Sequence, residues 1–190
     1  MSEPLALLAR PDKLSLGGGG MLIWAPPFPL WADRPGFWDH ACFLEHRVEP
    51  LFTVTLLDLD AGLRPVPLAL QSRHWTPADL TQDYTAEGLT LREHKALVDD
   101  VLVSELMLVN DADQPRRLIA VVWTCQRVGT ADEGPWLDDP RVEAGHIRFT
   151  RRARGQGVVS DARFAVAIGA DQQPRSWAVG LSEGRLNYPE

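Results

Sequence analysis

The sequence has few cysteines, and none of them lies in a spacing that binds zinc or supports redox chemistry. Cys42 and Cys125 are the only two among 190 residues. Two cysteines are too few for a disulfide framework, and neither belongs to a CxxC pair. We therefore expect two free thiols in a reducing compartment.

Basic residues are also scarce, since 19 Lys and Arg stand against 26 Asp and Glu for a formal charge of -7. Nucleic-acid binding needs clustered basic residues, so no nucleic-acid partner is expected. The one basic cluster, "RFTRRAR" at 148–154, is predicted to be a solvated strand end. No run reaches the roughly 18 apolar residues of a membrane span. The N-terminal "MSEPLALLARPDKL" has an acidic residue where a signal peptide carries basic ones. We expect a cytoplasmic protein without a membrane partner.

Motifs of metal and phosphate chemistry are absent as well. The chain has no HxH or HExxH pattern, and "GGGG" at 17–20 lacks the Lys-Ser/Thr of a phosphate loop, which leaves flexibility as its expected purpose. No metal and no cofactor are expected, with a cupin-like metal site built from separate strands as the alternative. The five histidines are dispersed: His40, His46, His74, His94 and His146.

What the sequence does contain is apolar residues at a period of two, broken by turn formers. "LFTVTLLDLDAGLRPVPLAL" from Leu51 predicts strand, turn at 60–62 and strand, and "TAEGLTLREHKALV" predicts another turn at 87–88. "DARFAVAIG" alternates Phe164, Val166 and Ile168 on one face. Repeated strands without helical periodicity predict an all-β fold, an antiparallel β-sandwich formed by residues 1–190 as a single domain.

The first 42 residues differ in composition from the rest. "GGGGMLIWAPPFPLWADRPGFWDH" holds four consecutive glycines, four prolines and three tryptophans. Glycine and proline interrupt it too often for a long element, while its aromatics favour packing over a free linker. We expect residues 1–42 to form an irregular arm, with short strands, packed on the sandwich.

The segment "SELMLVNDADQPRRLIAVVWTCQRV" at 104–128 has two apolar runs joined by five turn-forming residues at 111–115, which predicts a hairpin. Asp99 and Asp100 are predicted to form the turn before its first strand. Both faces of that strand are apolar, which indicates either a central strand covered on both sides or one packed against another molecule. One face carries Val101, Val103, Met107 and Val109, and the other carries Leu102, Leu106 and Leu108.

Two stretches resemble a known family. "LMLVNDADQPRRLIAVVW" and "GFWDHACFLEHRVEPLFTVTLLDLDAGLRPVPL" are similar to the β-sandwich domain that precedes the α/α toroid of many glycoside hydrolases and phosphorylases, glycogen-debranching and amylo-glucosidase-like enzymes among them. The similarity covers about residues 20–128. In that family the acid and base carboxylates lie on the helical toroid. The resemblance therefore implies a non-catalytic accessory domain that packs on a catalytic helical domain or a partner subunit, including its own copy, and helps to shape a glycan cleft.

Two alternative functions remain open at this point. The chain is either a fragment of a longer enzyme or a stand-alone sandwich, and a stand-alone sandwich could be an autonomous carbohydrate-binding module or an aldose epimerase-like enzyme. The carbohydrate-binding module predicts oligosaccharide binding, and the epimerase-like enzyme predicts turnover that depends on one acid and one histidine.

Tryptophan faces are the candidate oligosaccharide platforms, because a sugar's C–H face can rest on an indole ring. The candidates are Trp31, Trp38, Trp75 and Trp136, of which the first two could instead anchor the arm and the last two lie near predicted loops. Trp123 and Trp177 lie in strand patterns and are expected in the core. Asp39 within "GFWDH" is the one weak catalytic candidate, an acid among aromatics, with a structural hydrogen bond as the alternative role.

Overall fold

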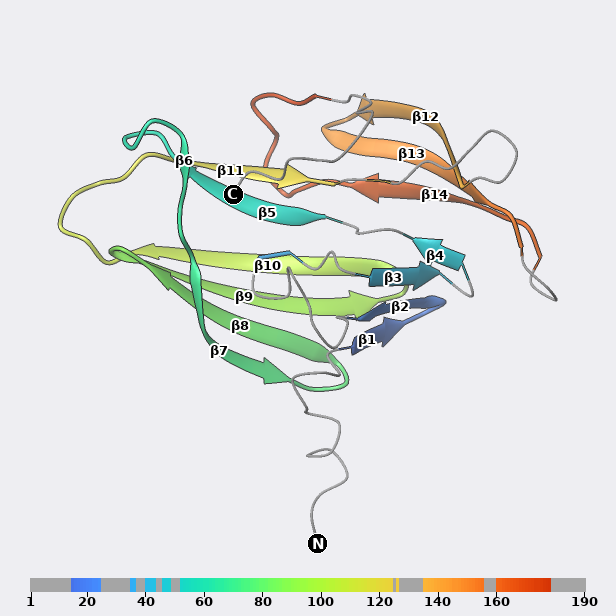
Figure 1. Cartoon of the computed structure of the whole chain (residues 1–190), viewed down its shortest axis with the longest axis horizontal. Helices are drawn as coiled ribbons and strands as arrows, with labels where there is room; N and C mark the ends of the chain where they lie inside the picture. The colour runs from blue at the N-terminus through green and yellow to red at the C-terminus, as the bar shows by residue number, and fades with distance from the viewer. Residues whose placement is uncertain are drawn as a thin grey trace, which may run out of the picture. The chain divides into compact units, whose positions relative to one another are not determined.

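A computed structural model describes residues 15–24, 35–36, 40–43, 46–48, 52–124, 126, 135–155 and 160–178. These residues contain fourteen strands and no helix, and all of their strand pairs are antiparallel (Figure 1). The prediction of an all-β fold is confirmed. Within this described part of the chain there is accordingly no helix with the length and apolarity to cross a membrane.

The chain divides into two compact units, Met1–Cys125 and Gln126–Glu190, and each is described by itself. Among the described residues, the first unit contains three sheets and the second contains one. The expectation of one domain over residues 1–190 stays a prediction.

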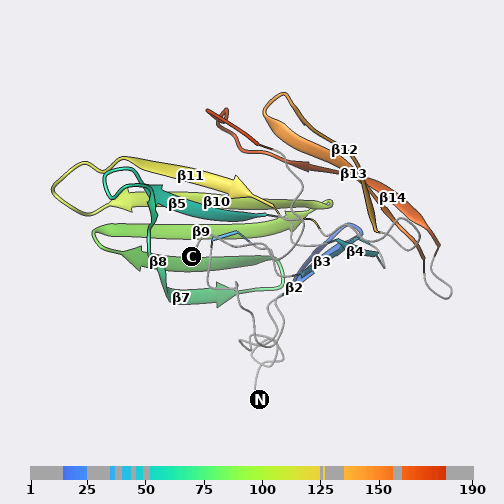
Figure 2. The ribbon, with the colours of Figure 1, turned by 45° about the horizontal axis from the view of Figure 1, so that its top comes forward.

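The largest sheet of the first unit has the strand order β10-β9-β8-β7, which Figure 2 shows as a ladder of successive neighbours. Its strands are β7 (Ala69–Trp75), β8 (Asp79–Ala86), β9 (Leu89–Val98) and β10 (Val101–Asn110). The predicted turns at 87–88 and 99–100 are both present. Asp99 and Asp100 have φ angles of 47° and 66°, and positive φ at both central residues marks a two-residue type I′ turn.

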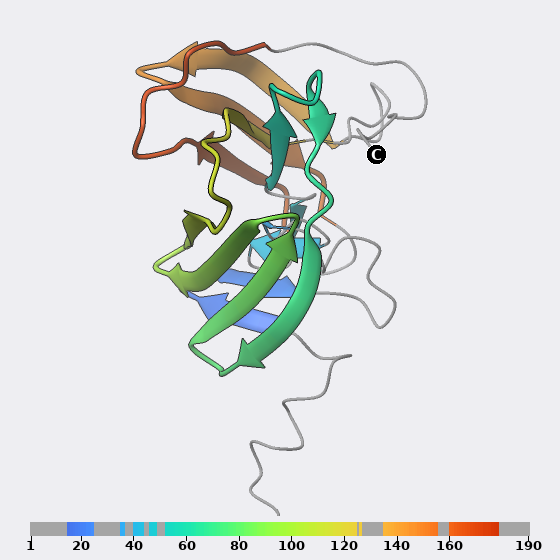
Figure 3. The same cartoon turned by 90° about the vertical axis from the view of Figure 1, so that its left-hand side faces the viewer.

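The described part of the arm and the residues just after it, up to Val48, form a second sheet of short strands in the order β1-β2-β3-β4. They are β1 (Ser15–Gly18), β2 (Met21–Trp24), β3 (His40–Phe43) and β4 (His46–Val48). β1 contacts β9, and Figure 3 shows the blue β1 and β2 beside the green sheet. A Cβ on Gly18 would lie 2.4 Å from the carbonyl oxygen of Leu97. Gly19 turns the chain with φ +61°. At these two positions the glycines therefore allow close packing and a tight turn.

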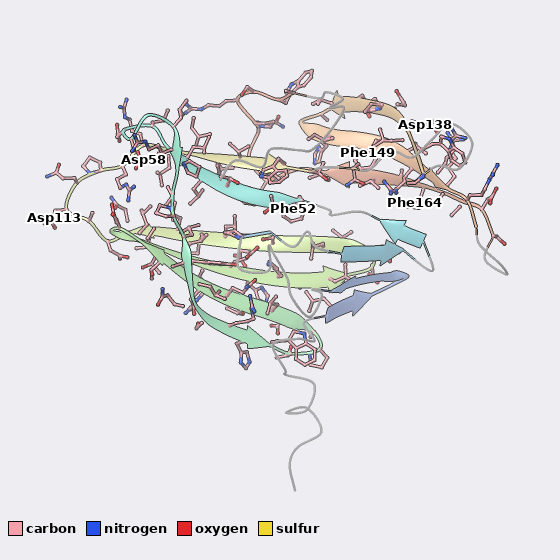
Figure 4. The ribbon with its side chains drawn as sticks, in the orientation of Figure 1. Phe52, Asp58, Asp113, Asp138, Phe149 and Phe164 are labelled. Atoms are coloured by element: carbon pink, nitrogen blue, oxygen red, sulfur yellow. The ribbon has the colours of Figure 1, made fainter. Side chains whose placement is uncertain are left out.

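The third sheet has the order β11-β5-β6, with β5 (Thr53–Asp58), β6 (Arg64–Pro65) and β11 (Leu118–Trp123). The predicted hairpin at 104–128 is therefore wrong, because β10 pairs with β9 and β11 pairs with β5. Residues 111–117 carry the chain from one sheet to another, with Asp113 on this connection in Figure 4. The crossing is held by a backbone hydrogen bond from Leu59 N to Arg117 O and by a hydrogen bond from Arg117 N to Asp60 Oδ2.

A buried apolar cluster lies between these sheets, as expected for a sandwich. Leu56 of β5, Val66 and Leu89 of β9 form its centre. Partly buried residues from β8 and β11 pack against it, so both sheets contribute apolar side chains to one core. Several antiparallel sheets thus pack together within the first unit, consistent with the predicted β-sandwich.

The second unit is a sheet in the order β12-β13-β14, formed by β12 (Trp136–Glu143), β13 (His146–Ala153) and β14 (Ala162–Ile168). The loop expected around Trp136 is instead a strand with a bulge after Asp138. The predicted alternation in β14 is present, and Figure 4 labels Phe149 on β13 and Phe164 on β14. The basic cluster belongs to β13, where Arg151 is buried, so it is more than a solvated strand end.

Candidate functional site on the β9–β10 hairpin

Strand β9 has a buried face that mixes apolar and charged side chains. Leu89, Leu91 and Leu97 are buried on it, and between them lie Glu93 at 0% and Lys95 at 1% exposure. Charged residues are almost never fully buried unless they are paired. The sequence holds a signal for this pair. Side chains at positions 89 to 97 point alternately to the two faces of the strand, and Glu93 and Lys95 have odd numbers like the three leucines, so they lie on the same face. The apolar period alone did not single them out.

The carboxylate of Glu93 accepts hydrogen bonds from three different strands or segments. Oε1 accepts from the backbone N–H of Gly36 at 2.7 Å and from the hydroxyl of Ser104 at 2.5 Å. Oε2 accepts from the hydroxyl of Tyr84 at 3.3 Å and lies 3.2 Å from Nζ of Lys95. Such charge-assisted bonds offset the cost of removing the carboxylate from water.

The ammonium of Lys95 completes the same cluster. Nζ donates to the carbonyl oxygen of Gly36 at 2.8 Å and to Oε1 of Gln82 at 2.8 Å. Glu93 and Lys95 thus bind the N–H and the C=O of a single residue, Gly36. We call Gln82, Tyr84, Glu93, Lys95 and Ser104 the buried polar cluster. It holds a backbone segment of the arm on the sheet, and every one of these contacts is made within the chain.

The residue before Gly36 is held from the neighbouring sheet. The carbonyl oxygen of Pro35 accepts from Thr53 Oγ1 at 2.8 Å and from Val54 N at 3.0 Å. Gly36 has φ +89°, and a Cβ there would lie 2.6 Å from the Cα of Thr53. Only glycine fits this position without displacing backbone.

The opposite face of the hairpin is apolar and exposed. Val98, Val101, Val103, Met107 and Val109 form this apolar surface, and their exposed fractions lie between 43% and 58%. Leu102, Leu106 and Leu108 belong to the other face, on which the first two are half-buried and Leu108 is 40% exposed. The predicted alternation is therefore present, but it does not bury the whole second face. Glu105 lies between Val103 and Met107 along the apolar surface of β10 and directly opposite His94 of β9.

Strand β10 is an edge of its sheet, and among the described strands it pairs only with β9. The pairing is unbroken from Val101–Val98 to Asn110–Leu89. The other edge strand, β7, carries a bulge between Leu70 and Ser72. Bulges and polar side chains discourage further pairing at an edge, whereas a long, regular, apolar edge favours it.

Several polar residues of strands β7 to β9 and of the connection after β7 form hydrogen bonds with one another. Asp83 accepts from Arg92 Nε at 2.6 Å and from Ser72 at 2.7 Å, and these bonds lower the pKa of the Asp83 carboxyl. Asp79 bonds Thr76 and His94, and these bonds, that of Thr76 foremost, lower its pKa. The polar part of the face is thus internally bonded.

The tryptophan candidates are placed as follows. Trp75 ends β7 and Trp136 begins β12, and both are half-buried. The ring of Trp136 lies under two guanidinium groups, those of Arg152 at 5.1 Å and Arg154 at 5.9 Å from its centre, so cations of the chain itself stack on the ring. Trp31, Trp38 and Asp39 lie outside the described residues.

The two tryptophans expected in the core differ from each other. Trp123 is half-buried, and its Nε1 donates to Thr55 Oγ1 at 3.2 Å. Trp177 is 63% exposed and lies outside any strand, so its assignment to the core is wrong. In the described ranges no group of three or more His, Cys, Asp or Glu residues is arranged to hold a metal ion.

Comparison with known proteins adds no relative. No family model matches the chain, and neither curated proteins nor solved structures give a match.

Proposed function

We propose that the chain is a non-catalytic β-sandwich accessory domain that docks on a protein partner through the apolar surface of β9 and β10. The partner is the helical catalytic domain of a carbohydrate-active enzyme, whose glycan cleft the accessory domain helps to shape. The observation that carries the proposal is the row of five apolar side chains exposed by 43% to 58% along one hairpin. Contiguous exposed apolar surface marks interaction sites. The family resemblance of residues 20–128 supplies the class of partner.

The apolar surface is large enough to direct docking but not to account for it alone. Completing the burial of five half-exposed side chains yields about 1 kcal/mol each, or roughly 5 kcal/mol. A micromolar complex requires about 8 kcal/mol. The partner must therefore also make polar contacts, and the open edge of β10 offers backbone groups for them.

A site-specific crosslink tests this docking. Benzoylphenylalanine replaces Met107 in the apolar surface or, as the matched control, Thr85 on the polar part of the same face, in chains expressed in their native host. We expect a crosslinked species from position 107 and not from position 85. Mass spectrometry of that species should identify a glycoside hydrolase or phosphorylase catalytic domain.

Two results would contradict the proposal. Equal crosslinking from both positions, or none from position 107, would remove the docking surface. A saturable change in tryptophan fluorescence when oligosaccharide is added to the isolated chain would favour the carbohydrate-binding module, and sugar epimerisation by the isolated chain would favour the enzyme.

A further inference from the structure

We propose that the partner docks by adding an extended strand to the edge of β10, and that this strand carries apolar residues at alternate positions with a Lys or Arg opposite Glu105. The inference rests on the proposed function, because it specifies the segment by which the partner binds. Strand addition supplies main-chain hydrogen bonds for affinity and alternating side-chain contacts for specificity.

The register of β9 and β10 determines which backbone groups of β10 face outward. A two-residue turn makes its flanking residues, Val98 and Val101, a hydrogen-bonded pair. Hydrogen-bonded and non-hydrogen-bonded pairs alternate along an antiparallel ladder. The odd-numbered residues of β10 therefore direct their N–H and C=O groups to β9. The residues whose groups point away from β9 are Leu102, Ser104, Leu106, Leu108 and Asn110.

Apart from the charge of Glu105, the residues of this edge lack the features that block strand addition. Between 101 and 110 there is no proline, no lysine and no bulge. A partner strand that pairs with several outward groups adds main-chain hydrogen bonds to the free energy that the apolar surface supplies. The bulged β7 edge of the same sheet offers no comparable continuous ladder.

Charge selects a basic partner over a second copy of this chain. An antiparallel second copy in full register would place Glu105 opposite Glu105 and Asp99 opposite Asp111, and like charges directly opposite each other are destabilising. A shift of the register by one pair places Glu105 opposite Val103 or Met107. With a net charge of -7, the chain also repels its own copy. A basic residue opposite Glu105 removes this mismatch.

The binding test uses a fluorescein-labelled ten-residue peptide that alternates threonine and valine, with lysine at its sixth position. In antiparallel register this lysine faces Glu105 and the valines face the apolar residues of β10. We expect saturable binding, measured by fluorescence anisotropy. Replacing the peptide's lysine with glutamate should weaken binding about tenfold, and Glu105→Lys in the protein should reverse that preference.

Substitutions at Leu108 separate strand addition from simple apolar contact. Leu108→Pro removes an outward N–H at an edge position that tolerates proline, whereas Leu108→Ala removes side-chain volume and keeps the N–H. We expect Leu108→Pro to weaken peptide binding about tenfold and Leu108→Ala to change it less than about threefold. Thermal melts establish that both variants are folded, and Glu105→Lys tests the same surface without a change in the backbone.

The outcomes distinguish the binding mode from the docking surface. Absence of peptide binding, or equal binding by the two Leu108 variants, would refute strand addition. Crosslinking from position 107 that persists in Leu108→Pro would leave the docking surface in place while refuting this mode. Sedimentation showing a dimer of the chain that Leu108→Pro dissociates would make the second copy the occupant and overturn the basic partner.

Discussion

Replacing Lys95 with methionine should destabilise the first unit strongly. The substitution keeps most of the side-chain volume but removes the ammonium, which is 1% exposed. It leaves the carboxylate of Glu93, at 0% exposure, with the hydrogen bonds from Gly36, Ser104 and Tyr84 but without the cation 3.2 Å away. The backbone carbonyl of Gly36 and the amide oxygen of Gln82 each lose a donor at 2.8 Å.

The expected magnitude follows from these losses. Breaking a buried ion pair by removing one partner costs about 3–5 kcal/mol, because a buried charge remains uncompensated. The double variant Glu93→Gln, Lys95→Met removes both charges. It should therefore be more stable than Lys95→Met alone by about 1 kcal/mol or more, although it has one more substitution.

Urea denaturation monitored by tryptophan fluorescence measures both quantities. The wild type, both single variants and the double variant form a complete cycle, and an unchanged m-value shows that the unfolding transition is comparable among them. A loss of unfolding free energy below about 1 kcal/mol for Lys95→Met, or additive effects in the double variant, would refute the view that Glu93 and Lys95 are energetically coupled and shielded from water.

Two further results are expected. Gly36→Ala should lower the free energy of unfolding by about 1–3 kcal/mol, because Gly36 has a positive φ and the added Cβ would lie 2.6 Å from the Thr53 backbone. Gly62→Ala, at φ +73° with open space around it, should lower it by about 1 kcal/mol. Equal losses of stability in urea titrations would contradict the close approach at Gly36. The hydrogen bond from Arg116 lowers the pKa of Asp58 below 3.8, so this pair stabilises the fold above about pH 3.8 and the stabilisation is lost as the pH falls through the lowered pKa. Arg116→Met should therefore lower the melting temperature more at pH 7 than at pH 3, and a constant difference would count against it.

The strand content of this fold could be predicted from the sequence because its signals are local. Alternation predicted β5, β9 and β14, and the turns were predicted from Asp60-Ala61-Gly62, Glu87-Gly88 and Asp99-Asp100. Such signals depend on backbone preferences of neighbouring residues, which a sequence states directly. The turn at Asp99 and Asp100 is one example, since aspartate tolerates the positive φ that a two-residue turn requires.

Strand pairing could not be predicted in the same way. Residues 111–115 have the composition of a hairpin loop, yet the two-residue turn before Val101 gives β10 its partner in β9. The next apolar run then finds β5, more than fifty residues earlier in the chain. Composition indicates that the chain turns, but which strands meet depends on the burial of faces that are distant in sequence.

The buried polar cluster was missed for a related reason. A glutamate and a lysine two residues apart are typical of a solvated strand face, and the local sequence "REHK" suggests nothing else. Their burial depends on Gly36 and Ser104, which reach them from other parts of the chain. The tryptophans were misjudged for the same reason, because the candidate Trp136 lies under arginines of its own chain while Trp177, expected in the core, is exposed.

The two faces of the hairpin cooperate in the proposed docking. An edge strand without support frays. The free energy of binding a partner must then also offset the conformational entropy that the edge strand loses when it becomes ordered. In its middle, β10 is held by the hydrogen bond from Ser104 to Glu93. At its first end, Gly20 N donates to the carboxylate of Asp100. At its last end, the N–H of Asp111 donates to the Gly88 carbonyl, and the carboxylate of Asp111 accepts from Thr90. The edge is thus ordered before any strand arrives, so an added strand bears only its own ordering cost.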